Sequence, residues 1–373
     1  MACYWGTSPT TAWSGTPWRL REALMRQTEV VDVAPQLAQP VRQALRAAGV
    51  RKTASGWRSH WRHSAPAVSL LERDMRRQVR RQRPDVVLEI QDIGVLDSSP
   101  YLVMQDLSYG ILLDRYGPTG VPHFRSLGRR RIEALKRRQE IVYQHASALL
   151  PMSRWLASHL EGTGASRDKI HVVNPGINMP VPDVGSLPVR RLAAVKRLIM
   201  VGRDFDTKGG AQVVAAFALL RKQLGRGIEL TIVGPKEWPL RGAVPDGVTF
   251  LGQQPVTRIP DLLDAHDLFV MPSLFEGFGI AFVEALVRGL PCIGRDDCAM
   301  PEIIDTKTGG RLVGSDDAED LADLILDALD DDSLYAECAR LAPERLAHYS
   351  WQRAASQVLE VAHKVHGAAL IRP

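Results

Sequence analysis

The stretch "DLFVMPSLFEGFGIAFVEALVRG", Asp267 to Gly289, predicts the fold because it joins a strand, a glycine-containing loop and a helix. Its start, "DLFVMPS", has the apolar run of a buried strand. The segment "IAFVEALVRG" has the apolar spacing of a helix, which Gly289 and Pro291 end. Glu276 lies in the loop, and Glu284 lies at the border of the helix's apolar stripe. The stretch therefore predicts a strand–helix unit of an α/β protein with a carboxylate at the strand's carboxyl end.

Strand-like and helical patterns alternate along the whole chain, which predicts parallel sheets covered by helices. The predicted strands are residues 29–34, 85–92, 100–106, 146–153 and 169–176, and then "RLIMVG", "IELTIVG", "VTFLG", "DLFVMPS" and "LPCIGRD". A proline-rich segment, Met179 to Arg197, separates the two series. We therefore predict two doubly wound Rossmann-like domains, residues 1–182 and 183–350, which face a central cleft that holds the ligand. Residues 351–373 are predicted as a helix that packs back on the first domain.

The composition is that of a globular protein with room for two cores. The chain has 373 residues, of which 45% are hydrophobic and 24% are charged. No apolar run approaches the roughly 20 residues that span a bilayer, and the first residues lack the order of a signal peptide. The cysteines show neither the spacing nor the histidine clustering of metal ligands. The sequence therefore predicts a cytoplasmic protein without a structural metal.

The net charge of +5 is concentrated in two basic runs, "ERDMRRQVRRQRPD" and "RRRIEALKRRQE". In the first run the arginines recur at helical spacing with apolar residues between them, which favours the solvated face of an amphipathic helix. Contact of these arginine-rich helices with an anionic membrane, or with a phosphorylated acceptor, stays open as an alternative. Nucleic acid is disfavoured because no recognised nucleic-acid motif accompanies the charge.

The first candidate site is the loop in "VGRDFDTKGGAQVV". A strand ends at Gly202, Arg203 and Lys208 follow, and Gly209-Gly210 lead into a helix. A helix N-terminus attracts anions, arginine binds two phosphate oxygens at once, and lysine adds a point charge. The loop therefore predicts a diphosphate clamp, with an ordinary surface loop as the alternative. The P-loop pattern GxxxxGK[ST] is absent.

The second candidate site is the pair of carboxylates in the opening stretch. Glu276 follows a strand, and Glu284 lies at the rim of a buried face, where a carboxylate is costly unless it is hydrogen-bonded. A sugar diol would satisfy it by donating from two hydroxyls. Gly277 and Gly279 would let the backbone approach a ligand closely. The alternative is that Glu284 pairs with a local lysine or arginine.

Two further candidates lie in the first half of the chain. The Ser14–Thr16 turn precedes Pro17, a first-turn proline, and so predicts a helix start that faces the cleft. Gln105 and Asp106 end a predicted strand, although a lone Asp in that place is more often a cap or turn former than a catalyst.

From Ala146 to Val365 the chain resembles the retaining GT-B-fold glycosyltransferases of glycosyltransferase family four. The resemblance rests on six motifs in order: "KIHVVNPGIN", "LIMVGRDFDTKGG", "VTFLGQQP", "DLFVMPSLFEGFGIAFVEAL", "GLPCIGRDDCAMPEII" and "YSWQRAASQVLEVAHKV". It implies a GT-B fold in which residues 1–182 bind the acceptor and residues 183–350 bind the donor.

The resemblance also implies roles for individual residues. Arg203 and Lys208 would hold the donor diphosphate and stabilise it as the leaving group, as a divalent metal does in other transferases. Glu276 and Glu284 match the family's E-x7-E signature, with Glu276 near the transferred sugar and Glu284 at the nucleotide ribose. The implied catalytic residues are Asp106, Glu276, Arg203 and Lys208, and the implied donor-binding residues are Gly15, Thr16, Arg203, Lys208, Glu276, Phe278, Gly279, Ile280 and Glu284.

The chain departs from the family's pattern at three points. Many members have histidine where this chain has Gln105, so only the role of Asp106 is carried over. The first loop reads Ser14-Gly15 in place of the common Gly-Gly, and Asn174–Gly176 reads "NPG" in place of "PNG".

The implied activity is transfer of a hexose, with retention, from a UDP- or GDP-linked sugar to an acceptor hydroxyl, without cofactor or metal. The acceptor would be a sugar, a lipid-linked glycan or a small molecule, and the departing phosphate would help to deprotonate it. Glu276 and Glu284 would not be a glycosidase pair, because Glu284 faces the ribose. The alternatives are a phosphorylase, for which no pyridoxal phosphate lysine is evident, a non-catalytic sugar-nucleotide-binding protein, and a basic RNA-binding protein.

Overall fold

The computed structural model describes the chain except for residues 6–8, 54–55, 116–126, 188–194 and 372–373. The chain divides into two compact units, of which the first is Met1–Gly176 with Trp351–Pro373 and the second is Ile177–Ser350. The division at Gly176 lies before the predicted boundary at residue 182, and part of the predicted proline-rich linker lies outside the described residues. Of the helices in the described residues, none is long and apolar enough to cross a bilayer.

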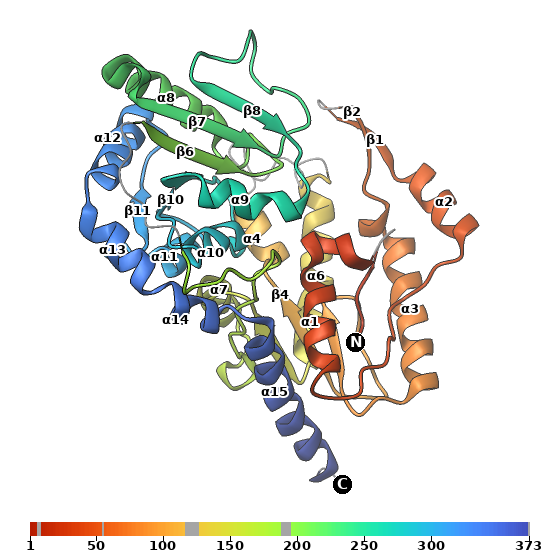
Figure 1. Cartoon of the computed structure of the whole chain (residues 1–373). Coiled ribbons are helices and arrows are strands. Elements are labelled where there is room, and N and C mark those ends of the chain that lie inside the picture. The colour runs from red at the N-terminus through yellow and green to blue at the C-terminus, as the bar shows by residue number, and fades with distance from the viewer. Residues whose placement is uncertain (6–8, 54–55, 116–126, 188–194, 372–373) are drawn as a thin grey trace. The chain divides into compact units, whose positions relative to one another are not determined.

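A six-stranded parallel sheet forms the centre of the second unit (Figure 1). Its strands are β6 (Lys196–Val201), β7 (Ile228–Val233), β8 (Val248–Gly252), β9 (Leu268–Val270), β10 (Cys292–Arg295) and β11 (Gly310–Val313). Its helices are α8 (Gly210–Leu224), α9 (Ile259–Asp264), α10 (Ile280–Leu286), α11 (Met300–Ile303), α12 (Ala318–Leu329), α13 (Asp332–Arg340) and α14 (Ala342–His348). All five strands predicted for this half are confirmed. Strand β11 was missed because its four residues are only half apolar and include Arg311.

The order of strands across this sheet is β11-β10-β9-β6-β7-β8. The chain therefore adds β7 and β8 on one side of β6, and then returns to the other side of β6, where it forms β9. In a doubly wound sheet, the carboxyl ends of the two strands at such a reversal are where ligands bind. The topology thus selects the loop after β6 and the loop after β9.

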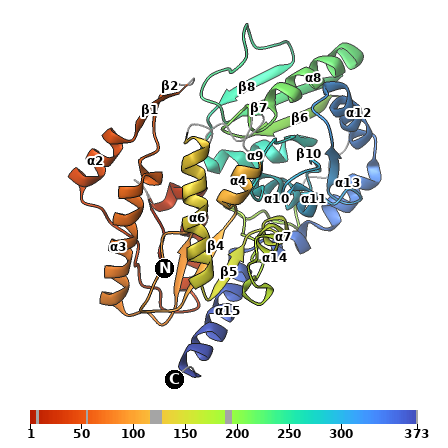
Figure 2. The same ribbon diagram turned by 180° about the vertical axis from the view of Figure 1, so that it is seen from behind.

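Helices cover this sheet and bury its central strands from both sides. Helices α8 and α12 pack against each other (Figure 2), and residues such as Phe217 and Ile325 join the strands in one apolar core. Phe282 of α10 meets Phe269 of β9 edge-on, with ring centroids 5.5 Å apart. Strands buried in this way read as unbroken apolar runs, which is why the sequence predicts them well.

The first unit has a three-stranded parallel sheet in the order β3-β4-β5. The strands are β3 (Val87–Ile90), β4 (Tyr101–Gln105) and β5 (Ala148–Pro151), and a separate hairpin joins β1 (Val50–Thr53) to β2 (Gly56–Ser59). The α-helices are α1 (Thr16–Met25), α2 (Gln39–Ala48), α3 (Ala65–Gln82), α4 (Tyr109–Asp114), α6 (Arg129–His145), α7 (Arg154–Gly162) and α15 (Trp351–Ile371). Helix α15 packs against α1, and Ser356 Oγ donates to Gln27 Oε1 at 2.9 Å.

Two strands predicted for the first unit are not regular strands. In residues 29–34, Val33 N donates to Met1 O, but no ladder forms. In residues 169–176, one bridge pairs Ile170 with Leu149. Each segment runs into a proline, Pro35 or Pro175, which lacks the N–H that a ladder needs. Both predictions were wrong in type, although both segments are extended beside the sheet.

Candidate active site

The loops at the strand-order reversal of the second unit are in direct contact. Leu274 N, in the loop after β9, donates to Thr207 O, in the loop after β6, at 2.9 Å. Gly209 has φ of +74°, and a Cβ there would lie 2.4 Å from Pro272 O. Only glycine therefore allows the two loops to approach so closely.

Lys208 and Glu276, which the sequence predicted separately, form an ion pair between these loops. The side chain of Lys208 is 21% exposed and that of Glu276 is 15% exposed, so both are largely withdrawn from water. Ser273 Oγ also donates to Glu276 Oε2, at 3.4 Å. The pair places a cation and a hydrogen-bond acceptor side by side at the carboxyl edge of the sheet.

Arg203 lies in the same loop as Lys208 and is exposed. Among the described residues, no hydrogen bond or ion pair engages its guanidinium. Helix α8 begins directly after Gly209 and has no side-chain cap at its N-terminus. The first turn of a 15-residue helix therefore presents backbone N–H groups beside two cations, which is the chemistry that a diphosphate requires.

Glu284 lies on α10 and is half-buried, as the sequence predicted. Its Oε1 accepts from Asn178 N at 3.0 Å. Burial raises the pKa of Glu284 to about 7, against the opposing effects of the Asn178 and Met179 N–H groups and of Arg288. A protonatable carboxyl is thus held at the rim of α10.

The cation nearest to Glu284 in the sequence is Arg288, one turn further along the chain, and its charge lowers the pKa of Glu284. Arg288 also pairs with Asp264 at 2.7 Å and donates to Pro180 O at 3.0 Å. Glu284 is held by backbone donors, and a carboxylate with two such donors has lone pairs left for hydroxyl groups.

The residues Phe278, Gly279 and Ile280 form the start of α10. Gly279 has φ of +100°, and its virtual Cβ would lie 3.1 Å from Glu276 Cγ. The Phe278 ring is buried and meets Tyr349, with centroids 6.1 Å apart. Any ligand contact of Phe278 would therefore be through its backbone.

Sequence reasoning missed Arg295, which ties the loops of this edge together. Its guanidinium donates to Gln212 Oε1 at 3.0 Å and to Ser315 O at 3.2 Å, and it reaches Pro272 O at 3.4 Å. It also pairs with Asp316 at 2.8 Å. Only its place at the carboxyl end of a predicted strand, "LPCIGRD", could have pointed to it.

In the first unit, the predicted turn has an unusual backbone. Trp13, Ser14 and Gly15 have φ of 47°, 57° and 87°, so three consecutive residues are left-handed. Helix α1 begins at Thr16, which is buried, with Pro17 in its first turn. Non-glycine residues in this region cost free energy and are concentrated at functional sites.

Gln105, which stands where the family often has histidine, is buried at the end of β4. Its Nε2 donates to the Tyr143 hydroxyl group. Asp106 follows it and is half-buried. A second acid at the same edge, Asp92, was missed: it accepts from Gln139 Nε2 at 3.0 Å, and burial raises its pKa to about 6 although Arg138 lowers it.

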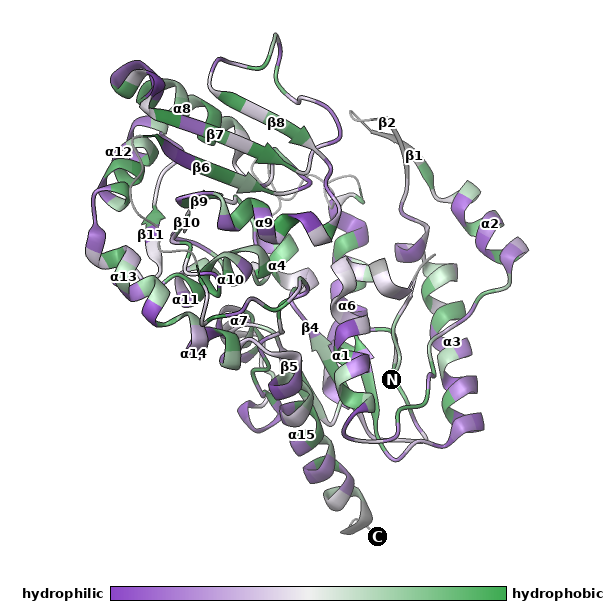
Figure 3. Cartoon of the chain, viewed as in Figure 1, coloured by the Kyte–Doolittle hydropathy of each residue, from purple (hydrophilic) through white to green (hydrophobic). Residues whose placement is uncertain are grey.

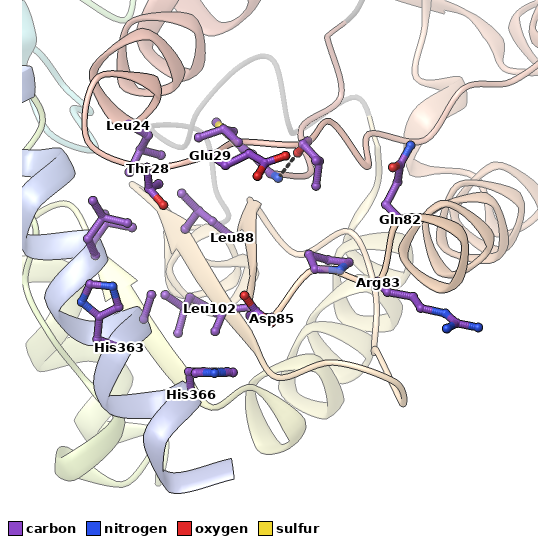
Figure 4. A pocket seen from close by; sticks show the side chains of 18 residues that line it. Leu24, Thr28, Glu29, Gln82, Arg83, Asp85, Leu88, Leu102, His363 and His366 are labelled. Atoms are coloured by element: carbon purple, nitrogen blue, oxygen red, sulfur yellow. Dashed lines mark hydrogen bonds between the residues drawn. The ribbon is translucent and has the colours of Figure 1, made fainter. Parts of the chain in front are cut away.

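A pocket of about 370 Å³ opens elsewhere in the first unit (Figure 4). Its lining includes Asp85, Leu88 and Leu102 near the starts of β3 and β4, and His363 and His366 of α15. It therefore lies at the amino ends of the strands and contains none of the predicted site residues.

Comparisons with known proteins identify a matching family and similar sequences. Residues 193–345 match the family described as "Glycosyl transferases group 1". The amylovoran biosynthesis glycosyltransferase AmsK of Erwinia amylovora is 32% identical over 219 residues, which are 55% of this chain and 53% of that protein. The chain thus spans about half the length of the curated relatives that it matches.

Solved structures show the same fold at low identity. The lipopolysaccharide glycosyltransferase WaaG superposes with a TM-score of 0.65 at 17% identity, over 97% of this chain and 98% of that one. The Anabaena protein HepE, solved with UDP and glucose, gives 0.59 at 16% identity, over 100% and 99%. The chain therefore has the GT-B fold of these glycosyltransferases, and its residues 193–345 match the glycosyl transferases group 1 family.

Proposed function

We propose that this protein is a retaining glycosyltransferase that moves a hexose from a nucleotide diphosphate-sugar to an acceptor hydroxyl. The observation that supports this most is the ion pair of Lys208 with Glu276 at the strand-order reversal. The pair places the ammonium group of Lys208, which can bind a phosphate, beside the carboxylate of Glu276, which can accept from sugar hydroxyls. UDP-glucose is the first donor to test, because HepE was solved with UDP and glucose.

The donor diphosphate would sit against the N-terminus of α8, with Lys208 and Arg203 on its oxygens. As the bond from the anomeric carbon to the phosphate oxygen breaks, negative charge grows on the diphosphate. Fixed cations stabilise that charge more in the transition state than in the ground state, which is what lowers the barrier. In this proposal two side chains and a helix end neutralise the leaving group without a metal.

Glu276 would exchange its bond to Lys208 for bonds from hydroxyl groups of the transferred sugar. The diphosphate would take over Lys208, so neither charge of the pair would lose its partner. The acceptor oxygen would then bond to the anomeric carbon on the face that the diphosphate leaves. The acceptor's proton would pass to a departing phosphate oxygen, so no separate protein base is required.

Glu284 would accept hydrogen bonds from the two ribose hydroxyls, and the backbone of Phe278, Gly279 and Ile280 would contact the sugar and phosphates. Gly15 and Thr16 would contribute to donor binding, and Asp106 to catalysis, as the family resemblance implies. The acceptor would be a sugar, a lipid-linked glycan or a small molecule.

The test is a panel of UDP, GDP, ADP and TDP sugars in which thermal stabilisation and donor turnover are measured on the full chain. We expect one nucleotide series to stabilise the protein, and its sugar to be transferred or slowly hydrolysed with retention at the anomeric carbon, as read by NMR. Stabilisation without turnover would support the non-catalytic binding protein instead. A panel without any response would contradict the donor site itself.

A further inference from the structure

Helix α2, Gln39–Ala48, separates its side chains into two halves. One half carries polar and charged residues and the other carries apolar residues, at the spacing of a helical face. The polar half is Gln39, Arg42, Gln43 and Arg46, and the apolar half is Pro40, Val41, Ala44, Leu45, Ala47 and Ala48. Figure 3 shows hydrophilic and hydrophobic turns following each other along this helix.

The apolar half of α2 is not packed into the first unit. All ten residues of α2 are described and none is buried, whereas α1, α3, α6 and α7 each bury several. Val41 is 39% exposed, and of the other apolar residues only Leu45 is half-buried. The helix is held at its C-terminal end, where Ser59 Oγ donates to Arg46 O at 2.7 Å. An apolar helix face that remains in water indicates a surface with which it associates.

The charge around α2 identifies the kind of surface. Between Asp32 and Glu72 the sequence has no acidic residue, but it has five arginines and one lysine. Among the described residues, no carboxylate pairs with Arg42 or Arg46. The segment therefore complements an extended negative surface.

The arginine-rich helices for which the sequence left membrane contact open as an alternative are different. In α3, Arg76 pairs with Glu72 at 2.8 Å, and Arg77 pairs with Asp74. In α6, Arg138 reaches Glu72 at 3.0 Å. Both helices also bury their apolar faces, with residues such as Met75, Val79, Ile132, Leu135 and Val142. Their positive charge is partly neutralised, and they have no apolar face to insert.

We propose that α2 docks the protein, lying flat, on an anionic lipid bilayer. Its apolar half would enter the boundary between headgroups and acyl chains, and Arg42 and Arg46 would contact lipid phosphates. The apolar half is made mostly of alanine, so binding is reversible and depends on the charge. This inference is independent of the proposed transferase activity.

The test is flotation of the full chain with vesicles of phosphatidylglycerol and phosphatidylcholine in equal parts, beside vesicles of phosphatidylcholine alone. We expect binding to the first, loss of that binding in high salt, and none to the second. Each arginine near an anionic surface contributes about fivefold in affinity, so Arg42→Gln with Arg46→Gln should weaken binding by about 25-fold. Val41→Asp should also weaken it, because it places a charge in the apolar half.

The matched control replaces Arg77 and Arg80 of α3 by glutamine, since these side chains are 74% and 67% exposed. This variant carries the same change in net charge and should bind nearly as wild type does. Equal weakening in the control would show attraction by net charge alone and would overturn the assignment to α2. Wild-type failure to float would overturn it too, as would α2-dependent binding to duplex RNA in place of vesicles. Circular dichroism shows whether each variant is folded.

Discussion

At the scale of single residues, the activity proposed here depends on Lys208 and Glu276 acting as one unit. In the structure each side chain satisfies the other, and in the proposed donor complex each would have a separate partner. Lys208→Ala should lower kcat/KM by about a hundredfold or more, because it removes a cation from the leaving group. Glu276→Gln should lower it as well, and the double variant should lose less than the sum of the two free-energy changes.

Lys222→Ala is the matched control for this pair. Lys222 is exposed in the last turn of α8, the helix whose first turn faces the proposed diphosphate. Lys222→Ala removes one positive charge, as Lys208→Ala does, but at the end of α8 away from the candidate site, so kcat/KM should stay as in wild type. Additive losses in the double variant would contradict the coupled role of Lys208 and Glu276.

Glu284 gives the donor affinity a pH dependence with a defined sign. Burial raises its pKa to about 7, so below that pH Glu284 is protonated in the protein without donor. In the proposed complex this proton must leave before both ribose hydroxyls can donate to the carboxylate. Affinity for a nucleotide diphosphate-sugar should therefore fall as pH drops below 7, by up to about tenfold per unit. The phosphates of the donor do not cause this dependence, because each carries one ester and one anhydride bond and therefore lacks the second ionisation, near pKa 6, of a monoester. Calorimetric titration from pH 5 to 9 measures this dependence, and Glu284→Gln should flatten it.

The same pKa shift acts on folding stability in the opposite direction. A carboxyl group whose pKa is raised on folding favours the folded state at low pH, and this contribution is lost as pH rises from about 4.5 to about 7. Relative to Glu284→Gln, the wild-type Tm should therefore decrease across this interval. A difference in Tm that does not vary with pH would show that Glu284 does not titrate there.

At the scale of elements, Arg295 connects two loops and a helix at one sheet edge. It binds Pro272 in the loop after β9, Ser315 in the loop after β11, and Gln212 in α8. Arg295→Met should let the loop that carries Glu276 move away from the loop that carries Lys208. We expect a higher KM for the donor with a smaller change in kcat, and partial recovery in Arg295→Lys.

A second arginine provides the control for this structural role. Arg311 of β11 binds Asp327 and Asp331, away from the loops after β6 and β9. Arg295→Met and Arg311→Met should each destabilise the fold by about 1–3 kcal/mol. Only the first should change the KM for the donor, and an equal KM change in both would reduce Arg295 to a stabilising residue.

Elements also show why the sequence predicted some features and not others. The central strands β6, β9 and β10 of the second unit are largely buried and read as apolar runs, so their pattern alone predicts them. Residues 29–34 include Glu29 and Asp32 among apolar residues, and their backbone bonds to Met1 stop at Val33, two residues before Pro35. The bonds of Arg295 leave no pattern, because its partners are backbone oxygens, Asp316 and a glutamine 83 residues away.

At the scale of the whole molecule, the GT-B fold could be predicted from motifs in order along the chain, and two of these motifs contain Lys208 and Glu276. Their arrangement could not: Lys208 and Glu276 are 68 positions apart, and only the strand order brings them together. The number of basic residues in a helix did not predict which helix presents unpaired positive charge, because arginines of α3 and α6 form ion pairs with nearby acids. Arg42 and Arg46 of α2 lie outside both basic runs of the sequence.

The most direct test of the donor site is calorimetric titration of the full chain with UDP-glucose and, in parallel, the GDP-linked sugar. We expect one of the two to bind with one site per chain, Lys208→Ala to weaken that binding at least tenfold, and Lys222→Ala to leave it unchanged. Binding that is equally strong in wild type and Lys208→Ala, or no binding of either donor, would contradict a diphosphate-sugar site between the loops after β6 and β9.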